Sequence, residues 1–125
     1  MNVQKVVDEL KREYPGKNII LNDSDNPTEI ICEIEPANLN PDKSVAVAVL
    51  NSNIKHSHEV TTETYEVLKG NLELTKEGKT YFLSPGQKLK IEPGEYHIAK
   101  GHETWVKVTS VPAWNPEDQI LVEEG

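Results

Sequence analysis

From Lys17 to Ser110 the chain alternates apolar and polar residues with a period of two, and this rhythm restricts its fold more than any other feature. Successive side chains of a strand point to opposite faces, so the pattern predicts strands that turn one face toward a core. Turn-forming residues interrupt it at short intervals, and Glu77-Gly78 predicts a tight hairpin. Such short, regularly spaced strands are typical of an all-β sandwich or barrel. They are expected at 18–21, 29–34, 44–50, 63–69, 72–75, 80–83, 88–91, 97–100 and 104–110.

The run from Ser44 to Leu50, which reads SVAVAVL, departs from the alternation because both of its faces are apolar. Its valines share one face, and its alanines and leucine share the other. This composition predicts burial on both sides, either between two packed sheets or at a subunit interface.

The N-terminal residues have a different periodicity, which predicts a short amphipathic helix at 1–13. Apolar residues recur at the spacing of one helical face, and charged residues fill the other side. Tyr14-Pro15-Gly16 then ends the helix. We expect the apolar stripe to cover an open face of the barrel. It consists of Val3, Val6, Val7 and Leu10.

At 125 residues the chain has the size of one domain, so residues 1–125 are expected to fold together, with the barrel at 17–110 and a loop-like tail at 111–125. Trp114 is expected to anchor this tail. A hydrophobic content of 36% and a charged content of 27% are typical of a soluble globular protein.

The formal net charge is −8 and the basic residues are scattered, which argues against nucleic acid and membrane surfaces as partners. Nothing resembles a signal peptide or a spanning segment, so a cytoplasmic location is expected. Cys32 is the single cysteine, which excludes a disulfide within the chain. Because it lies in an apolar run, we interpret it as a small buried hydrophobe rather than a nucleophile.

His56 and His58 are two residues apart, and Glu63 follows five residues later. Side chains at i and i+2 of a strand share a face, so both imidazoles would point to one place. A short polar turn would bring Glu63 back to meet them. Two nitrogens and a carboxylate oxygen at one point are typical of a transition-metal site. Two solvated histidines and an ordinary surface carboxylate are the alternative interpretation.

A second stretch, Gly86 to His97, favours the metal site. It reads GQKLKIEPGEYH, in which Pro93-Gly94 predicts a tight turn. His97 would begin a new strand just beyond this corner and supply a fourth candidate ligand.

Together these residues resemble the two motifs of the cupin family. The first motif, G-x5-H-x-H-x4-E-x6-G, is matched by His56, His58, Glu63 and Gly70. The second, G-x5-P-x-G-x2-H-x3-N, is matched by Gly86, Gly94 and His97. Three positions depart from the motifs, and none of them is a metal ligand in the family. They are Leu50 in place of glycine, Glu92 in place of proline and Gly101 in place of asparagine.

The resemblance implies a double-stranded β-helix, the jelly-roll barrel of cupins, which commonly forms homodimers. It also implies one divalent metal held by His56, His58, Glu63 and His97. Three neutral imidazoles and a carboxylate suit Mn, Fe, Co, Ni or Zn, whereas Ca and Mg prefer harder ligands. Four protein ligands would leave two positions of an octahedral cation open for a substrate.

Three further residues bear on the site. Tyr65 shares the inward face of Glu63, so its hydroxyl is a candidate for substrate binding or proton transfer, with a barrel-filling aromatic as the alternative. Arg12, the only arginine, belongs to the predicted helix, so no guanidinium group is expected at the site. This argues against a heavily anionic substrate. His102 lies outside the motif and is expected to be a solvated loop histidine.

The expected ligand is a small molecule, and three functional classes stay open. The first is a metal-dependent sugar isomerase, epimerase or lyase, in which the cation would stabilise an enediolate of a small polar oxygenated metabolite. The second is an iron-dependent dioxygenase. The third is a non-catalytic binding or sensing barrel, and resemblance alone does not choose among them.

Overall fold

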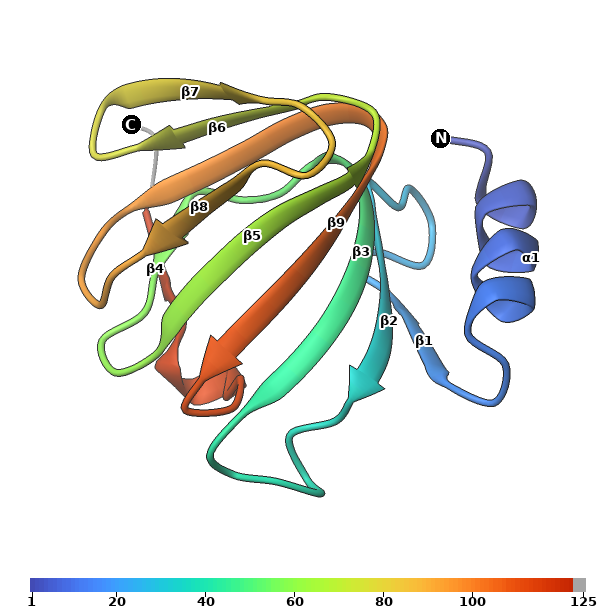
Figure 1. Cartoon of the computed structure of the whole chain (residues 1–125), viewed down its shortest axis with the longest axis horizontal. Helices are drawn as coiled ribbons and strands as arrows, with labels where there is room; N and C mark the ends of the chain where they lie inside the picture. Colours follow the sequence, from blue (N-terminus) through green and yellow to red (C-terminus); the bar gives the residue numbers. More distant parts are fainter. Residues whose placement is uncertain (123–125) are drawn as a thin grey trace.

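The structure, a computed structural model, describes residues 1–122. One α-helix packs beside a strongly curled antiparallel sheet (Figure 1). The elements are α1 (Val3–Glu13), β1 (Asn18–Leu21), β2 (Glu29–Glu35), β3 (Ser44–Ser52), β4 (His56–Ser57), β5 (Thr62–Lys69), β6 (Leu72–Lys76), β7 (Lys79–Leu83), β8 (Lys88–Ile91), β9 (His97–Val111), a short 3-10 helix η1 (Pro116–Asp118) and β10 (Ile120–Leu121). The all-β barrel with one N-terminal helix is therefore confirmed.

The long strand β9 joins the two parts of the barrel. Its C-terminal half pairs with β3 and β5, and its N-terminal half pairs with β6 and β4. The sequence predicted two separate strands here, at 97–100 and 104–110, and that prediction was wrong. The strand bends where Glu103 adopts a positive φ of 46°, and a side chain at Gly101 would place its Cβ 2.3 Å from Thr104 Oγ1. His102 is exposed at this bend, as expected.

Strand β3 separates two apolar clusters, which explains why both of its faces are apolar. The inner cluster fills the barrel and includes Ala48, Leu50 and Tyr65. The outer cluster lies between the sheet and α1 and includes Val47, Val49 and Leu10. The helix thus covers the sheet as expected, and a subunit interface is not needed to bury this strand.

Local sequence explains how α1 begins and how the β6–β7 hairpin turns. Asn2 caps the helix by accepting a hydrogen bond from the backbone amide of Lys5. Glu77 and Gly78 have φ values of 49° and 78°, the positive values that a two-residue hairpin of the primed type requires. The predicted hairpin is therefore confirmed.

The C-terminal residues are less loop-like than expected. Strand β10 pairs with β4, placing Leu121 opposite His56. Trp114 is 44% exposed, and the neighbouring Ala113, at 8%, is the buried residue. The prediction that the Trp114 side chain anchors this segment was therefore wrong. Residues 123–125 of the expected tail lie outside the described part.

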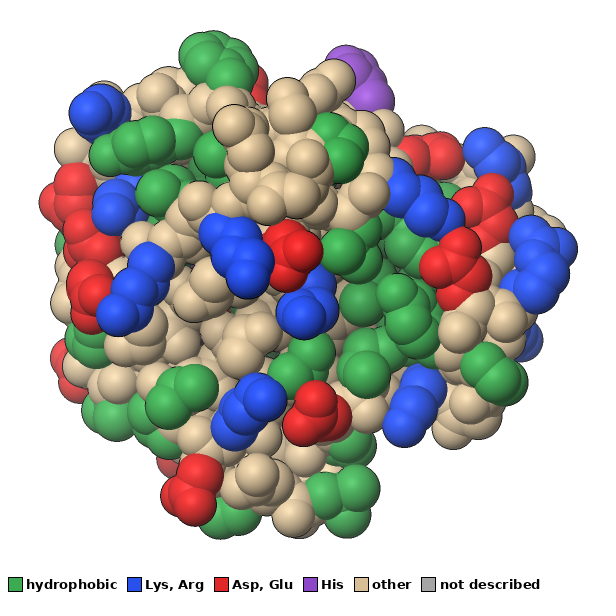
Figure 2. All heavy atoms as spheres, viewed as in Figure 1, with side chains coloured by type: hydrophobic (Ala, Val, Ile, Leu, Met, Phe, Trp, Pro, Cys, Tyr) green, Lys and Arg blue, Asp and Glu red, His purple; other side chains and the backbone are tan. Residues whose placement is uncertain are grey.

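No helix among residues 1–122 is long and apolar enough to cross a membrane. On the face shown in Figure 2, Lys and Arg side chains are interspersed with Asp and Glu. This face carries no continuous basic surface of the kind that nucleic acid would need.

Candidate metal centre

The structure brings together all four residues that the sequence singled out as ligands. His56 lies in β4, His58 immediately follows that strand, Glu63 lies in β5 and His97 begins β9. His56 and His97 are directly opposed in the β4–β9 ladder. The backbone amide of Gly94, in the predicted Pro-Gly turn, donates to the carbonyl of His58 at 2.7 Å. This bond ties the second motif to the first.

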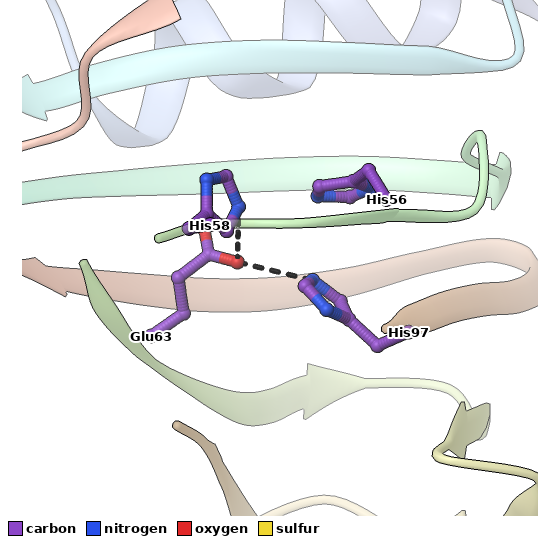
Figure 3. Close-up of side chains that lie close together, drawn as sticks. All are labelled: His56, His58, Glu63 and His97. Atoms are coloured by element: carbon purple, nitrogen blue, oxygen red, sulfur yellow. Dashed lines mark hydrogen bonds and ion pairs between the residues drawn. The ribbon is translucent and has the colours of Figure 1, made fainter. Parts of the chain in front are cut away.

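The four side chains lie close together, and the rings of His58 and His97 face the Glu63 carboxylate (Figure 3). One ligand atom from each lies within 4.8 Å of the others. Glu63 Oε1 is 3.0 Å from His58 Nε2 and 3.1 Å from His97 Nε2. All four are buried, from His97 at 0% exposed to His56 at 8%. A buried group of three imidazoles and one carboxylate is compatible with a divalent transition metal.

The other ring nitrogen of each histidine, Nδ1, faces a backbone carbonyl oxygen. His56 Nδ1 is 2.5 Å from the oxygen of Ile54, and His97 Nδ1 is 3.2 Å from that of Glu95. His58 Nδ1 is 3.0 Å from the oxygen of Asp118. Because a carbonyl only accepts, these contacts place a proton on Nδ1 of each ring, and in a neutral imidazole this leaves Nε2 with a lone pair. This tautomer is the one that metal-binding histidines commonly adopt.

His58 Nε2 gives a direct test of whether the residues fit a metal. Within residues 1–122 this buried atom has no aligned hydrogen-bond partner, although Glu63 Oε1 is close. A lone pair held against a carboxylate oxygen is repulsive unless a proton or a cation lies between them. A cation bound by His58, His97 and Glu63 would satisfy all three groups at once. The residues therefore fit the metal that the family resemblance implies.

The electrostatics of the cluster favour an ionised carboxylate. Burial by itself would raise the pKa of Glu63, but the imidazoles of His58 and His97 outweigh it and lower that pKa to about 2. Burial likewise acts to lower the pKa of His58, yet the Glu63 carboxylate raises it overall. Burial, followed by the charge of His97, lowers the pKa of His56.

Tyr65 lies beside the cluster, in agreement with its predicted inward orientation. It is 4% exposed, and its ring meets that of His97 edge to face with centroids 5.9 Å apart. Burial, followed by the charge of Glu63, raises the pKa of Tyr65 well above its ordinary value. The phenol is therefore protonated at neutral pH and can donate a hydrogen bond but cannot act as a base.

Glu29 is a second interior carboxyl, which sequence reasoning missed. It lies opposite Leu50 in the β2–β3 ladder, and directly opposed residues project to the same face. Leu50 belongs to the inner cluster together with Tyr65, so Glu29 also faces the barrel interior, where it is half-buried. Burial, followed by the charge of Glu63, raises the pKa of Glu29 to about 7. A carboxyl in this range can both donate and accept a proton near neutral pH.

Asp118 was also missed, and no motif could have signalled it. Its carboxylate accepts hydrogen bonds from the backbone amides of Glu59, Val60 and Thr61 at 2.9, 3.2 and 3.1 Å. These residues form the turn between His58 and Glu63. The turn that sets the spacing of two candidate ligands is thus held from the C-terminal end of the chain.

Known structures share this fold at low sequence identity. The nucleoside dehydratase Pac13 is 12% identical with a TM-score of 0.75, covering 88% of each chain, and variants of the Streptomyces protein have been solved with uridine. KdgF from a Halomonas species is 20% identical with a TM-score of 0.65, covering 74% of this chain and 87% of that one. A cupin-2 domain from Rhodospirillum rubrum is 10% identical with a TM-score of 0.74, covering 89% of this chain and 78% of that one.

No curated protein sequence matches the chain significantly. The family model of the cupin domain matches residues 45–111, which are more than half of the chain and contain all four clustered side chains. The chain belongs to the cupin family.

Proposed function

We propose that this protein is a metal-dependent enzyme that acts on a small, polar, oxygenated metabolite in a reaction of the isomerase, epimerase or lyase type. The observation that carries the proposal is the buried convergence of His56, His58, Glu63 and His97, with His58 Nε2 lacking an aligned hydrogen-bond partner within residues 1–122. A purely structural polar cluster would satisfy its buried nitrogen.

We assign the four clustered side chains as ligands of one divalent cation from the group Mn, Fe, Co, Ni and Zn. Such a cation, when bound, would polarise substrate oxygen atoms and make neighbouring protons more acidic. Four protein ligands leave room on an octahedral ion for two such oxygens, which suits a hydroxy-carbonyl compound.

The remaining interior groups would then move protons. Glu29 is the candidate acid–base residue, because its pKa of about 7 gives both protonation states near neutral pH. Tyr65 is the candidate hydrogen-bond donor to a substrate oxygen, because its phenol stays protonated. As a general base, the Glu29 carboxylate would take a proton from a carbon next to a carbonyl, and the resulting carboxylic acid would return it to the substrate.

The charge of the interior supports a neutral substrate. The buried polar and charged residues among 1–122 are histidines, hydroxyl-bearing side chains and Glu63, with no lysine or arginine. A carboxylate or phosphate on the substrate would therefore find no buried cationic side chain. The neighbour Pac13, whose Streptomyces variants were solved with the uncharged nucleoside uridine, has a barrel of this kind. Uridine is accordingly a reasonable first probe.

Metal content is the first experiment. Elemental analysis of untagged protein should find about one transition metal per chain, and His97→Ala should be empty. His102→Ala is the matched control, because it removes an exposed histidine outside the cluster and should keep its metal. If the wild-type protein neither retains nor binds any of the five metals, the proposal fails.

Turnover is the second experiment. The metal-loaded protein would be incubated in D₂O with uridine and with a panel of neutral hydroxy-carbonyl compounds, and products and deuterium incorporation would be followed by NMR. We expect one compound to react with the wild-type protein and His102→Ala, but not with Glu29→Gln. Iron as the native metal together with oxygen consumption would replace the proposal with a dioxygenase. Binding without any reaction across the panel would replace it with a binding barrel.

A further inference from the structure

The three histidines of the cluster are oriented in two different ways. For His56 and His97, the carbonyl that accepts from Nδ1 belongs to the residue two positions earlier, so each ring is oriented by the residues that directly precede it in the chain. For His58 the acceptor is the carbonyl of Asp118, 60 residues away in the chain. Only this ring depends on a distant segment for its orientation.

That segment, residues 112–122, is called the C-terminal strap here, and it lies beyond the part of the chain that matches the cupin domain. It runs beside the first motif along several residues. Strand β10 pairs Ile120 with Ser57, and the amide of Val122 donates to the carbonyl of Lys55 at 3.1 Å. The strap thus contacts the backbone on both sides of His56.

Asp118 makes the most specific contacts of the strap. Its backbone carbonyl faces His58 Nδ1, while its carboxylate accepts from the amides of the turn Glu59–Thr61. One residue therefore holds the His58 ring and the turn that leads from His58 to Glu63. A carboxylate bound by successive backbone amides forms charge-assisted hydrogen bonds, which are stronger than bonds between neutral groups.

We propose that Asp118 is a positioning residue of the metal centre. Its carboxylate holds the turn, this keeps its carbonyl against His58 Nδ1, and the imidazole thereby stays in the tautomer that presents Nε2 to the metal. The strap is then a functional part of the site rather than a surface extension of the barrel. This inference rests on the proposed metal binding.

Asp118→Ala is the informative substitution because it removes the carboxylate and keeps the backbone carbonyl. Without its carboxylate the strap can shift away from the turn, so His58 loses a fixed acceptor. Outer residues that orient metal-binding histidines typically contribute about 10-fold to 100-fold to metal affinity, and we expect a loss of that size. Asp118→Asn keeps one acceptor oxygen and should recover part of the affinity. Glu117→Ala removes the same charge from the adjacent exposed residue and should bind metal like the wild-type protein.

The first readout is the dissociation constant for Ni²⁺ alone, measured by calorimetry for the wild-type protein and the three variants. The second is the tautomer of each histidine in the metal-free protein, measured by long-range ¹H–¹⁵N NMR at about pH 8.5, where imidazoles are neutral. In Asp118→Ala we expect the His58 signals to move toward a mixture of tautomers, while those of His56 and His97 stay unchanged. A residue that only stabilised the fold would lower the melting temperature without this selective change.

The two readouts separate the inference from the function on which it rests. A wild-type protein that does not bind Ni²⁺ or any other transition metal would refute the proposed function, and the NMR measurement would still test the positioning of His58. Wild-type metal affinity and an unchanged His58 tautomer in Asp118→Ala would overturn the role of Asp118.

Discussion

Strands β2 and β3 have two faces whose chemistry differs sharply. The outer face carries Ile30, Cys32, Val47 and Val49 and packs against α1 through an apolar cluster. The inner face of the same strands begins with Glu29 and leads into the barrel where the histidines converge. The outer face contributes to stability through buried apolar side chains, whereas the inner face holds ionisable groups whose charge depends on pH. The outer face thus holds the helix on the sheet, and the inner face carries the candidate metal centre.

On the inner face, the pKa values of two carboxyls are shifted in opposite directions. Glu63 contacts two imidazoles, which lower its pKa to about 2 in spite of burial. Burial, together with the negative charge of Glu63, raises the pKa of Glu29 to about 7. Two carboxyls with separated pKa values are a common basis for distinct roles in one site. Here the ionised one suits a metal ligand and the other suits an acid–base residue.

The largest effect is expected from removing a ligand from the inner site. His97→Ala should lose the metal. Its affinity should fall by more than about 100-fold, because removing a ligand has a larger effect than removing a residue that only orients a ligand. Glu63→Gln should keep weak binding through its amide oxygen and make bound water more acidic, because the cation is less neutralised. Metal content and Ni²⁺ titration of both variants check this. Full metal in His97→Ala with none in Glu63→Gln would show that His97 is not a ligand.

The next largest effect is expected on the outer face. Leu10 is fully buried between α1 and the sheet, so Leu10→Ala should lower the free energy of unfolding by about 3 kcal/mol. Urea denaturation of the metal-free protein measures this. The Ni²⁺ affinity of the folded variant should match the wild-type value, because Leu10 does not contact the site. A change in affinity similar to that of a ligand variant would show that the two faces are coupled.

Sequence patterns predicted the inner site well because local spacing determines it. His56 and His58 share a strand entry, and Pro93-Gly94 forms the corner before His97, so the ligand set followed from motif and turn chemistry. The barrel and the role of the N-terminal helix followed from periodicity, and the family followed from the resemblance of the two motifs. The ligand roles themselves, the single domain, the cytoplasmic location and the homodimer stay predictions.

Glu29 and Asp118 could not be predicted, for two physical reasons. In β2 the more apolar face is the outer one, so alternation alone would place Glu29 toward solvent. Because α1 covers that apolar face, the face with Glu29 is the one that lines the barrel interior. Asp118 acts across 60 residues through its backbone and its carboxylate, and an acidic residue near a chain end carries no local signal of that role. The continuity of β9 through its bend was missed because the two halves pair with different strands but remain one strand.

A smaller effect is expected from neutralising Glu29. A carboxyl whose folded pKa is raised lowers stability once it ionises, so the penalty is absent below its ordinary value of 4.5 and complete above about 7. Glu29→Gln should therefore stabilise the metal-free protein by about 2 kcal/mol at pH 8 and by little at pH 5. This value takes about 1.4 kcal/mol for each unit of pKa shift and is reduced because Glu29 is partly exposed. Urea denaturation at both values checks this. Glu33→Gln, on the same strand, is the control; equal stabilisation by both variants would contradict a special environment for Glu29.

The smallest effect concerns the pH dependence of metal binding, and it distinguishes the inner groups from one another. His58 Nε2 must be free of its proton to bind a cation, and the Glu63 carboxylate raises the pKa of His58 above 6.5. Metal affinity should therefore begin to fall while the pH is still above 6.5, by about 10-fold per pH unit for one competing proton. Glu63, with a pKa of about 2, stays ionised throughout this range and contributes nothing to the slope. His56, whose pKa is lowered, should become a second competitor for protons only below pH 6.5. The fall of metal affinity with decreasing pH should therefore become steeper there.

Ni²⁺ titrations from about pH 8 to pH 5.5 measure this curve, in the range where histidine titrates. Glu63→Gln provides the decisive comparison, because it removes the negative charge that stabilises the protonated imidazole of His58. Its affinity should be lower overall, but the decline should begin at a lower pH than in the wild-type protein. A decline that begins at the same pH in both proteins would mean that Glu63 does not set the proton affinity of His58. The 3.0 Å contact between Glu63 Oε1 and His58 Nε2 would then have no part in controlling when the site can accept a metal.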